Sequence, residues 1–170
     1  MKKLFILTLI AGLITSFNAS AQQDKSKRPS PPAKVSQTLA SGAAISIDYS
    51  QPSVKGRPME TLTPAGKVWR TGANEATVFE TSKDVKIEGK TLPAGKYSVY
   101  SIPGENEWTL IFNKTWNQWG TIYKADEDAL RVNVKPGKAN KFTEMMTFNI
   151  DNGGKVSLAW ADTQVDFKVQ

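Results

Sequence analysis

KVSLAWA, from Lys155 to Ala161, is the stretch that decides the fold class, because apolar and polar residues alternate along it. TQVDFKVQ, from Thr163 to Gln170, continues the alternation. Successive side chains of a β-strand point to opposite faces, so a period of two is typical of a strand with one buried face. The expected buried set is Val156, Leu158, Trp160, Val165, Phe167 and Val169.

The same pattern recurs along most of the chain in short runs that turn residues separate. The runs are AISIDYS (44–50), DVKIEG (84–89), EWTLIFN (107–113) and ALRVNVKP (129–136). The turns contain Pro-Ala-Gly (93–95), Pro-Gly-Glu-Asn (103–106), Pro-Gly (136–137) and Asp-Asn-Gly-Gly (151–154). About ten such strands at this spacing predict an all-β domain, a single antiparallel β-sandwich that could be jelly-roll-like. Helical periodicity is weak, with YKADEDALR (123–131) able to form one turn.

The amino-terminal residues predict a secretory signal peptide over 1–21. Lys2 and Lys3 precede an apolar run, and Ala19-Ser20-Ala21 supplies the small residues of a cleavage site, with cleavage after Ala21. The apolar run is shorter than the roughly 20 residues of a spanning helix, so we expect no retained membrane anchor. Residues 22–33 are polar and proline-rich and predict a flexible tail, which leaves 34–170 as the domain. The expected location is periplasmic or secreted.

The composition excludes several chemistries. The chain has 0 cysteines and 0 histidines, which rules out Ser-His-Asp and Cys-His catalysis and disfavours zinc, copper and haem sites. No cofactor and no metal are expected. The formal charge of +6 becomes +4 when Lys2 and Lys3 leave with the signal peptide, and the remaining lysines are scattered along strands. No motif of a nucleic-acid module is present, so no nucleic-acid partner is expected.

The longest stretch without alternation, Gln51 to Glu75, ends in WRTGANE (69–75). This run, with SIDYSQPSVKGR (46–57), LPAGKYSVYSIPGENEWTLIFN (92–113) and QWG (118–120), resembles the family called domain of unknown function 2911. The resemblance extends over about Pro31 to Gln170. It implies an exported bacterial protein with a β-rich fold, but it supplies no activity and no catalytic residues.

Two interpretations of this excursion remain open. In the first, a loop-built polar pocket binds a glycan, a peptide terminus or a small acidic ligand. The expected binding residues are Tyr49, Arg57, Trp69, Arg70, Asn74 and Glu75. In the second, the loop is structural: Trp69 fills the core, Arg70 pairs with Glu75, Gly72 adopts positive φ and Asn74 bonds the backbone.

Three other groups of residues are weaker candidates. Glu75 with Asp48, or with Glu80, could supply the two carboxylates of a hydrolase or lyase that acts on glycans. Trp116 and Trp119 in NKTWNQWG (113–120) could form a carbohydrate platform, although tryptophans in small β domains more often fill the core or cover a sheet edge. The acidic turns at 126–128 and 151–154 lack the spacing of a calcium loop.

We therefore predict a non-enzymatic binding or interaction module. The alternatives are a glycan-acting hydrolase or lyase that uses Glu75 and Asp48, and a purely structural envelope protein.

Overall fold

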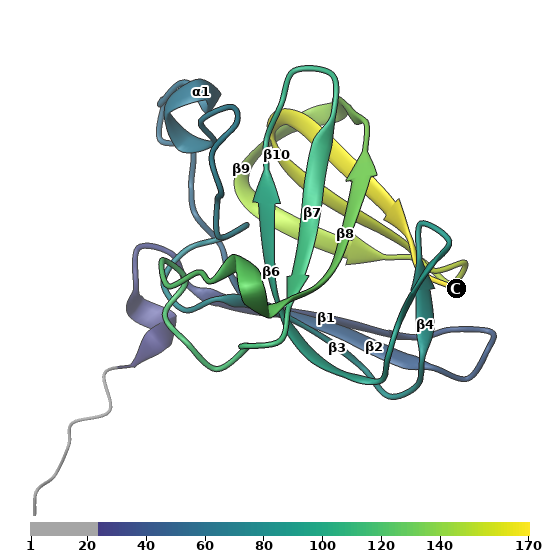
Figure 1. Cartoon of the computed structure of the whole chain (residues 1–170). Coiled ribbons are helices and arrows are strands. Elements are labelled where there is room, and N and C mark those ends of the chain that lie inside the picture. The colour runs from purple at the N-terminus through teal and green to yellow at the C-terminus, as the bar shows by residue number, and fades with distance from the viewer. Residues whose placement is uncertain (1–23) are drawn as a thin grey trace, which may run out of the picture.

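The computed structural model describes residues 24–170, so the expected signal peptide and its cleavage site lie outside the described residues. Six antiparallel strands form the main sheet in the order β1-β2-β3-β6-β7-β8 (Figure 1). Their bounds are Pro32–Thr38 (β1), Ala44–Ser50 (β2), Thr77–Thr81 (β3), Gly95–Ile102 (β6), Trp108–Asn113 (β7) and Asp128–Val134 (β8). Neighbours in this sheet are also consecutive in the chain, except where a small hairpin separates β3 from β6.

Two hairpins complete the fold. The long one pairs β9 (Pro136–Ile150) with β10 (Lys155–Lys168), and the short one pairs β4 (Val85–Ile87) with β5 (Lys90–Leu92). Helical turns are short: η1 (Lys25–Lys27), α1 (Met59–Leu62) and η2 (Ala125–Glu127). The prediction of an all-β, sandwich-like fold with about ten strands is confirmed. No helix within residues 24–170 is long and apolar enough to cross a membrane.

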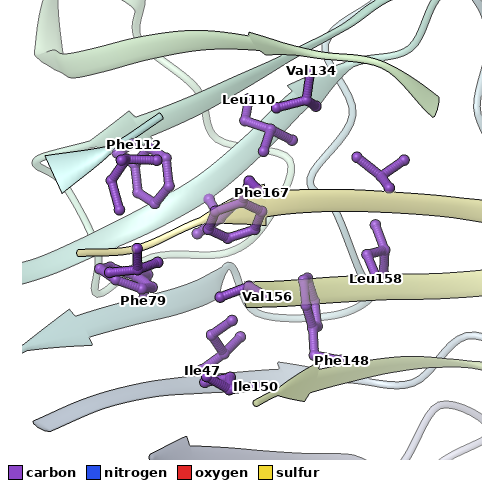
Figure 2. Close-up of a cluster of buried hydrophobic side chains, with 14 of the residues drawn as sticks. Ile47, Phe79, Leu110, Phe112, Val134, Phe148, Ile150, Val156, Leu158 and Phe167 are labelled. Atoms are coloured by element: carbon purple, nitrogen blue, oxygen red, sulfur yellow. The ribbon is translucent and has the colours of Figure 1, made fainter. Parts of the chain in front are cut away.

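The core lies between the main sheet and the β9–β10 hairpin, as Figure 2 shows for side chains of both layers. Phe112 packs edge-on against Phe79 and Phe167, at centroid distances of 5.3 and 6.1 Å. The buried set expected on β10 and just after it is buried as predicted, because alternate residues face the main sheet on each side of an irregularity at Ala161. Burial of this apolar surface is the main term that holds the two layers together.

Tyr49 joins the two layers. Its ring meets Phe148 edge-on at 5.0 Å, and its hydroxyl accepts the Phe148 backbone N–H at 3.1 Å. Burial raises the pKa of this hydroxyl, while the bond to Phe148 acts in the opposite direction. Tyr49 was predicted as a binding residue, but its contacts are those of a core residue.

The turn of the long hairpin depends on Gly154. This residue has φ +83°, which glycine adopts readily, and its N–H donates to the Asp151 carbonyl at 3.0 Å. Its own carbonyl accepts the Val169 N–H at 2.8 Å. The last residues of the chain are thereby tied to the turn, and Val169 also pairs with Ile87 of β4.

The excursion from Gln51 to Glu75 is held against the sheets along its length. Val54 donates its N–H to the Glu144 carbonyl at 2.9 Å, and Met146 donates to the Pro52 carbonyl at 2.9 Å. These two bonds attach the start of the excursion to β9. Helix α1 follows, a single turn that the sequence patterns did not predict.

The residues expected to form a tail contact the domain in the part that the structure describes. Strand β1 begins at Pro32, and Gln51 donates its N–H to the Pro31 carbonyl at 2.9 Å. Register pairs Pro32 with Ser50 at the start of β1. The segment from Asp24 to Pro31 therefore lies beside the end of β2 and the start of the excursion.

Candidate functional site

The polar loop, Trp69 to Glu75, is anchored at its first residue. Trp69 exchanges two backbone hydrogen bonds with Ser101 of β6, at 2.7 and 2.9 Å. Its ring stacks on Trp160 of β10 with centroids 5.6 Å apart and planes within 9°, and it meets Trp108 edge-on at 6.1 Å. Trp69 is half-buried and packs against the core. The polar loop thus starts from a rigid aromatic base.

Positive φ occurs at Thr71 (48°) and Asn74 (59°) and not at Gly72, which corrects the expectation for that glycine. Glycine is required at position 72 because the Thr77 side chain packs directly against its Cα. A Cβ there would lie 2.6 Å from the Thr77 hydroxyl. That hydroxyl donates to the Thr71 carbonyl at 2.9 Å, and the Thr71 and Ser101 hydroxyls are 3.0 Å apart. The middle of the loop is therefore fixed by buried hydroxyls.

Asn74 acts on the backbone, as the structural interpretation expected. Its side-chain amide donates to the Ser30 carbonyl at 3.0 Å, and its own carbonyl accepts the Gly120 N–H at 3.0 Å. Both φ and side-chain bonding identify it as a turn residue. Asn74 lines neither of the two cavities described below.

Glu75 does not pair with Arg70, so that part of the structural interpretation is wrong. Arg28 Nη1 donates to both Glu75 oxygens at 3.0 and 2.9 Å, and Lys25 Nζ lies 2.9 Å from Oε1. The partners come from the segment before β1, whose contacts the periodicity of the sequence does not reveal. Burial would raise the pKa of Glu75, but the bonds from Lys25, from the backbone and from Arg28 outweigh it and hold the pKa at about 2.

The ion pairs of Glu75 with Arg28 and Lys25 should contribute to the free energy of unfolding in a way that depends on acid pH. The folded pKa of Glu75 is below its ordinary value of 4.5, so the contribution is present above about pH 4.5 and is lost as the pH falls toward 2. The carboxylate is 39% exposed, so we expect at most about 1 kcal/mol. The free energy of unfolding of Glu75→Gln should be lower than that of the wild type at pH 6. This difference should disappear as the pH falls to 2, which unfolding curves over this range can measure. A difference that stays constant over this range would contradict the assignment.

The first cavity, here the arginine cavity, has a volume of ≈ 640 Å³. The side chains that matter for its chemistry are Arg57, Trp69, Arg70, Tyr100, Tyr123 and Trp160. Among residues 24–170, no carboxylate lines it. Tyr123 donates its hydroxyl to Asp128 at 2.8 Å, but that acid is already paired with Arg131 at 2.8 Å.

The guanidinium groups of the arginine cavity bond only carbonyls within the described chain. Arg70 Nε donates to the Gly72 carbonyl at 3.3 Å, and Arg57 donates to the carbonyls of Val54 and Ser53 at 3.0 and 2.6 Å. Neither arginine is in an ion pair among residues 24–170. The buried Trp160 indole N–H also finds no acceptor there. The two guanidinium groups therefore give the arginine cavity a surplus of positive charge and of N–H donors.

The second cavity, here the tryptophan groove, has a volume of ≈ 510 Å³ and lies on the other side of the polar loop. Its lining includes Tyr49, Asp48, Glu75, Trp116, Asn117 and Trp119. Trp116 is 39% and Trp119 46% exposed, so these rings do not fill the core, one of the two structural roles expected for them. Backbone bonds join this rim to the polar loop, since Ala76 donates to the Gln118 carbonyl at 3.0 Å.

Five of the six predicted binding residues are thus divided between two cavities, and Asn74 lines neither. Trp69, Arg70 and Arg57 line the arginine cavity, whereas Tyr49 and Glu75 line the tryptophan groove. Sequence analysis missed Tyr100, Tyr123 and Trp160 as cavity residues. Trp160 was expected to be buried, which is correct, but alternation cannot reveal that one edge of a buried ring borders a cavity.

Two of the three carboxylates proposed for catalysis, Asp48 and Glu75, line the tryptophan groove. Asp48 pairs with Lys34 at 2.9 Å and Glu75 with Arg28, while Glu80 pairs with Lys96 at 3.4 Å and lines a different depression. A general acid needs a raised pKa, whereas the pKa of Glu75 is lowered to about 2. Within residues 24–170 no group of three or more acidic side chains is placed to hold a metal ion.

Fold and site together define a small all-β, sandwich-like protein with two loop-built cavities. Residues 30–169 match the model of the family described as "Protein of unknown function (DUF2911)", and the chain belongs to this family. Comparisons with curated proteins and with solved structures gave no match.

Proposed function

We propose that this protein is an exported, non-enzymatic binding module whose arginine cavity takes a small anionic ligand. The observation that carries the proposal is the pair Arg57 and Arg70, which line a cavity free of carboxylates and have no anionic partner in residues 24–170. A guanidinium group binds a carboxylate or phosphate through a fork of two N–H donors. The cavity volume of ≈ 640 Å³ is that of a small-molecule site.

The aromatic side chains supply the remainder of the site. Trp69 and Trp160 stack on one another, so they present ring edges rather than open faces. The two arginines favour a ligand that carries further acceptor groups beside its anionic group. Sugar acids, dicarboxylates and sugar phosphates combine both.

Hydrolysis of a glycan has less support. The three candidate carboxylates, Asp48, Glu75 and Glu80, are all held in ion pairs, and none of them lines the arginine cavity. A purely structural role is the outcome in which no ligand is found. Export rests on the signal-like amino terminus and is part of the proposal.

The test is anion binding to the purified protein, measured by calorimetry with sugar acids, dicarboxylates and sugar phosphates. Arg70→Ala and Arg57→Ala should each weaken binding about tenfold or more, as expected for a hydrogen bond to a charged group. Binding should also weaken with added salt.

Arg28→Ala is the matched control, because its guanidinium is already paired with Glu75 in the other cavity. It should leave anion affinity unchanged. Equal losses in all three arginine variants would indicate general charge attraction and overturn the assignment of the cavity. The same conclusion would follow if none of the anions bound.

A further inference from the structure

The tryptophan loop, Lys114 to Gly120, exposes two indole rings. Trp116 and Trp119 are 39% and 46% exposed, yet both line the same groove. Large apolar side chains that are exposed together on one surface mark binding sites more often than isolated ones do. Lys96 Nζ lies 5.1 Å from the Trp116 ring centroid and helps to fix that ring.

This loop is held in place from both ends. Thr115 donates its N–H to the Asn113 side-chain oxygen at 3.1 Å and accepts the Ser98 hydroxyl at 2.9 Å. At the other end Gly120 is packed so closely that a Cβ would lie 2.7 Å from Arg70 Cδ. Rings on a loop fixed in this way lose little conformational freedom when a ligand binds, which favours affinity.

The charges of the tryptophan groove cancel. Its lining has the two cations Lys25 and Arg28 and the two anions Asp48 and Glu75. Glu75 is paired with both cations, and Asp48 with Lys34 outside the groove. This balance contrasts with the arginine cavity and favours a ligand without net charge.

Neutral sugars match the remaining chemistry. The C–H face of a pyranose ring is apolar and flat and can pack on an indole, while its hydroxyls need donors and acceptors around the rim. Asn117 offers an amide there, and its side chain has no hydrogen-bond partner among the described residues. The volume of ≈ 510 Å³ is in the range of small-molecule sites.

We infer that the tryptophan groove is a second site, which binds a neutral glycan by stacking of pyranose rings on Trp116 and Trp119. The site is separate from the arginine cavity and does not depend on the anion proposed for it. Asn117 and the paired charges of the rim orient the sugar hydroxyls. The groove binds the glycan without hydrolysing it, because Asp48 and Glu75 are both in ion pairs.

The test is retardation of the purified protein in native gels that contain a soluble neutral polysaccharide, such as β-glucan, xylan or galactomannan, followed by calorimetry with cello- and chito-oligosaccharides. We expect retardation by at least one of them. Trp116→Ala and Trp119→Ala should each weaken the binding about tenfold. Both rings are exposed, so these variants should remain folded.

Phe142→Ala is the matched control, since Phe142 is 55% exposed on β9 and lines neither cavity. It should leave retardation unchanged, and so should Arg57→Ala, since Arg57 lines only the arginine cavity. Loss of anion binding in Arg57→Ala with intact glycan binding would keep the two sites distinct. The inference is overturned if no neutral glycan retards the protein, if Phe142→Ala has the same effect as the tryptophan variants, or if sedimentation shows a dimer that Trp119→Ala dissociates.

Discussion

Gly154→Ala should lower the free energy of unfolding by about 3 kcal/mol, through backbone strain and overpacking together. Gly154 has φ +83°, where a side chain is strained. A Cβ would also meet the Val169 carbonyl, a backbone atom that cannot rotate away. Because that carbonyl belongs to the segment tied to β4, relief of the contact would displace the end of the chain from the core. Chemical denaturation monitored by tryptophan fluorescence measures the change.

Gly153→Ala is the control in the same turn. A Cβ there would lie 3.3 Å from the Asp151 carboxylate and 3.6 Å from Lys168 Nζ, both the ends of flexible side chains. Its φ lies outside the left-handed region. We expect a change within about 0.5 kcal/mol for a surface position of this kind. Equal losses at both glycines would mean that loss of turn flexibility, and not the Val169 contact, determines the effect.

Trp160→Ala should cost about 3–5 kcal/mol of unfolding free energy, the range for removal of a buried tryptophan side chain. Trp160 is buried and stacked on Trp69, so its loss leaves a void directly beneath the polar loop. Trp69 would lose its packing partner, and Arg70 beside it would lose a fixed position. Anion affinity should fall together with stability, which calorimetry and denaturation can follow on the same samples.

Trp160→Phe distinguishes the contribution of the aromatic ring to stability from that of the indole N–H. Phenylalanine keeps an aromatic surface against Trp69 and removes a buried donor that has no acceptor in the described chain. We expect a loss of less than about 2 kcal/mol, because the smaller cavity is partly offset by the absent donor. A loss as large as that of Trp160→Ala would show that the indole N–H is satisfied by a water or another group.

The fold was predictable because its signal is local. Val156, Leu158 and Trp160 alternate with polar residues, and each is buried since one face of β10 packs on the main sheet. Helix α1 was not predictable in this way, because a turn of 4 residues carries no periodicity. The long hairpin turn at 151–154 followed from its Asp, Asn and Gly residues, which have known turn preferences.

The candidate sites were only partly predictable, because they depend on contacts between distant segments. Arg70 was expected beside Glu75 on grounds of proximity and charge, yet positive φ at Thr71 and Asn74 turns the chain so that these side chains line different cavities. Glu75 instead meets Arg28, 47 residues earlier in the chain. No pattern within either segment carries that information.

The polar loop separates two cavities of different charge. Arg70 borders a cavity with unpaired cations, and Glu75 borders a groove in which charges cancel. A single short segment can therefore serve two ligands of different chemistry, because its first residues line one cavity and its last residue lines the other. Arg57→Ala tests the arginine cavity, and Trp116→Ala and Trp119→Ala test the tryptophan groove. None of these three substitutions changes a residue that lines the other cavity.

The attachment of Val169 to Gly154 and Ile87 has a consequence for the order of events during folding. Val165, Phe167 and Val169 are among the most buried residues, and Val169 pairs with a residue more than 80 positions earlier in the chain. Pairings between residues so far apart make the folding of an all-β domain slow, on the scale of about milliseconds to seconds. The hydrophobic core can therefore close only late in folding, when both ends of these pairings have come together.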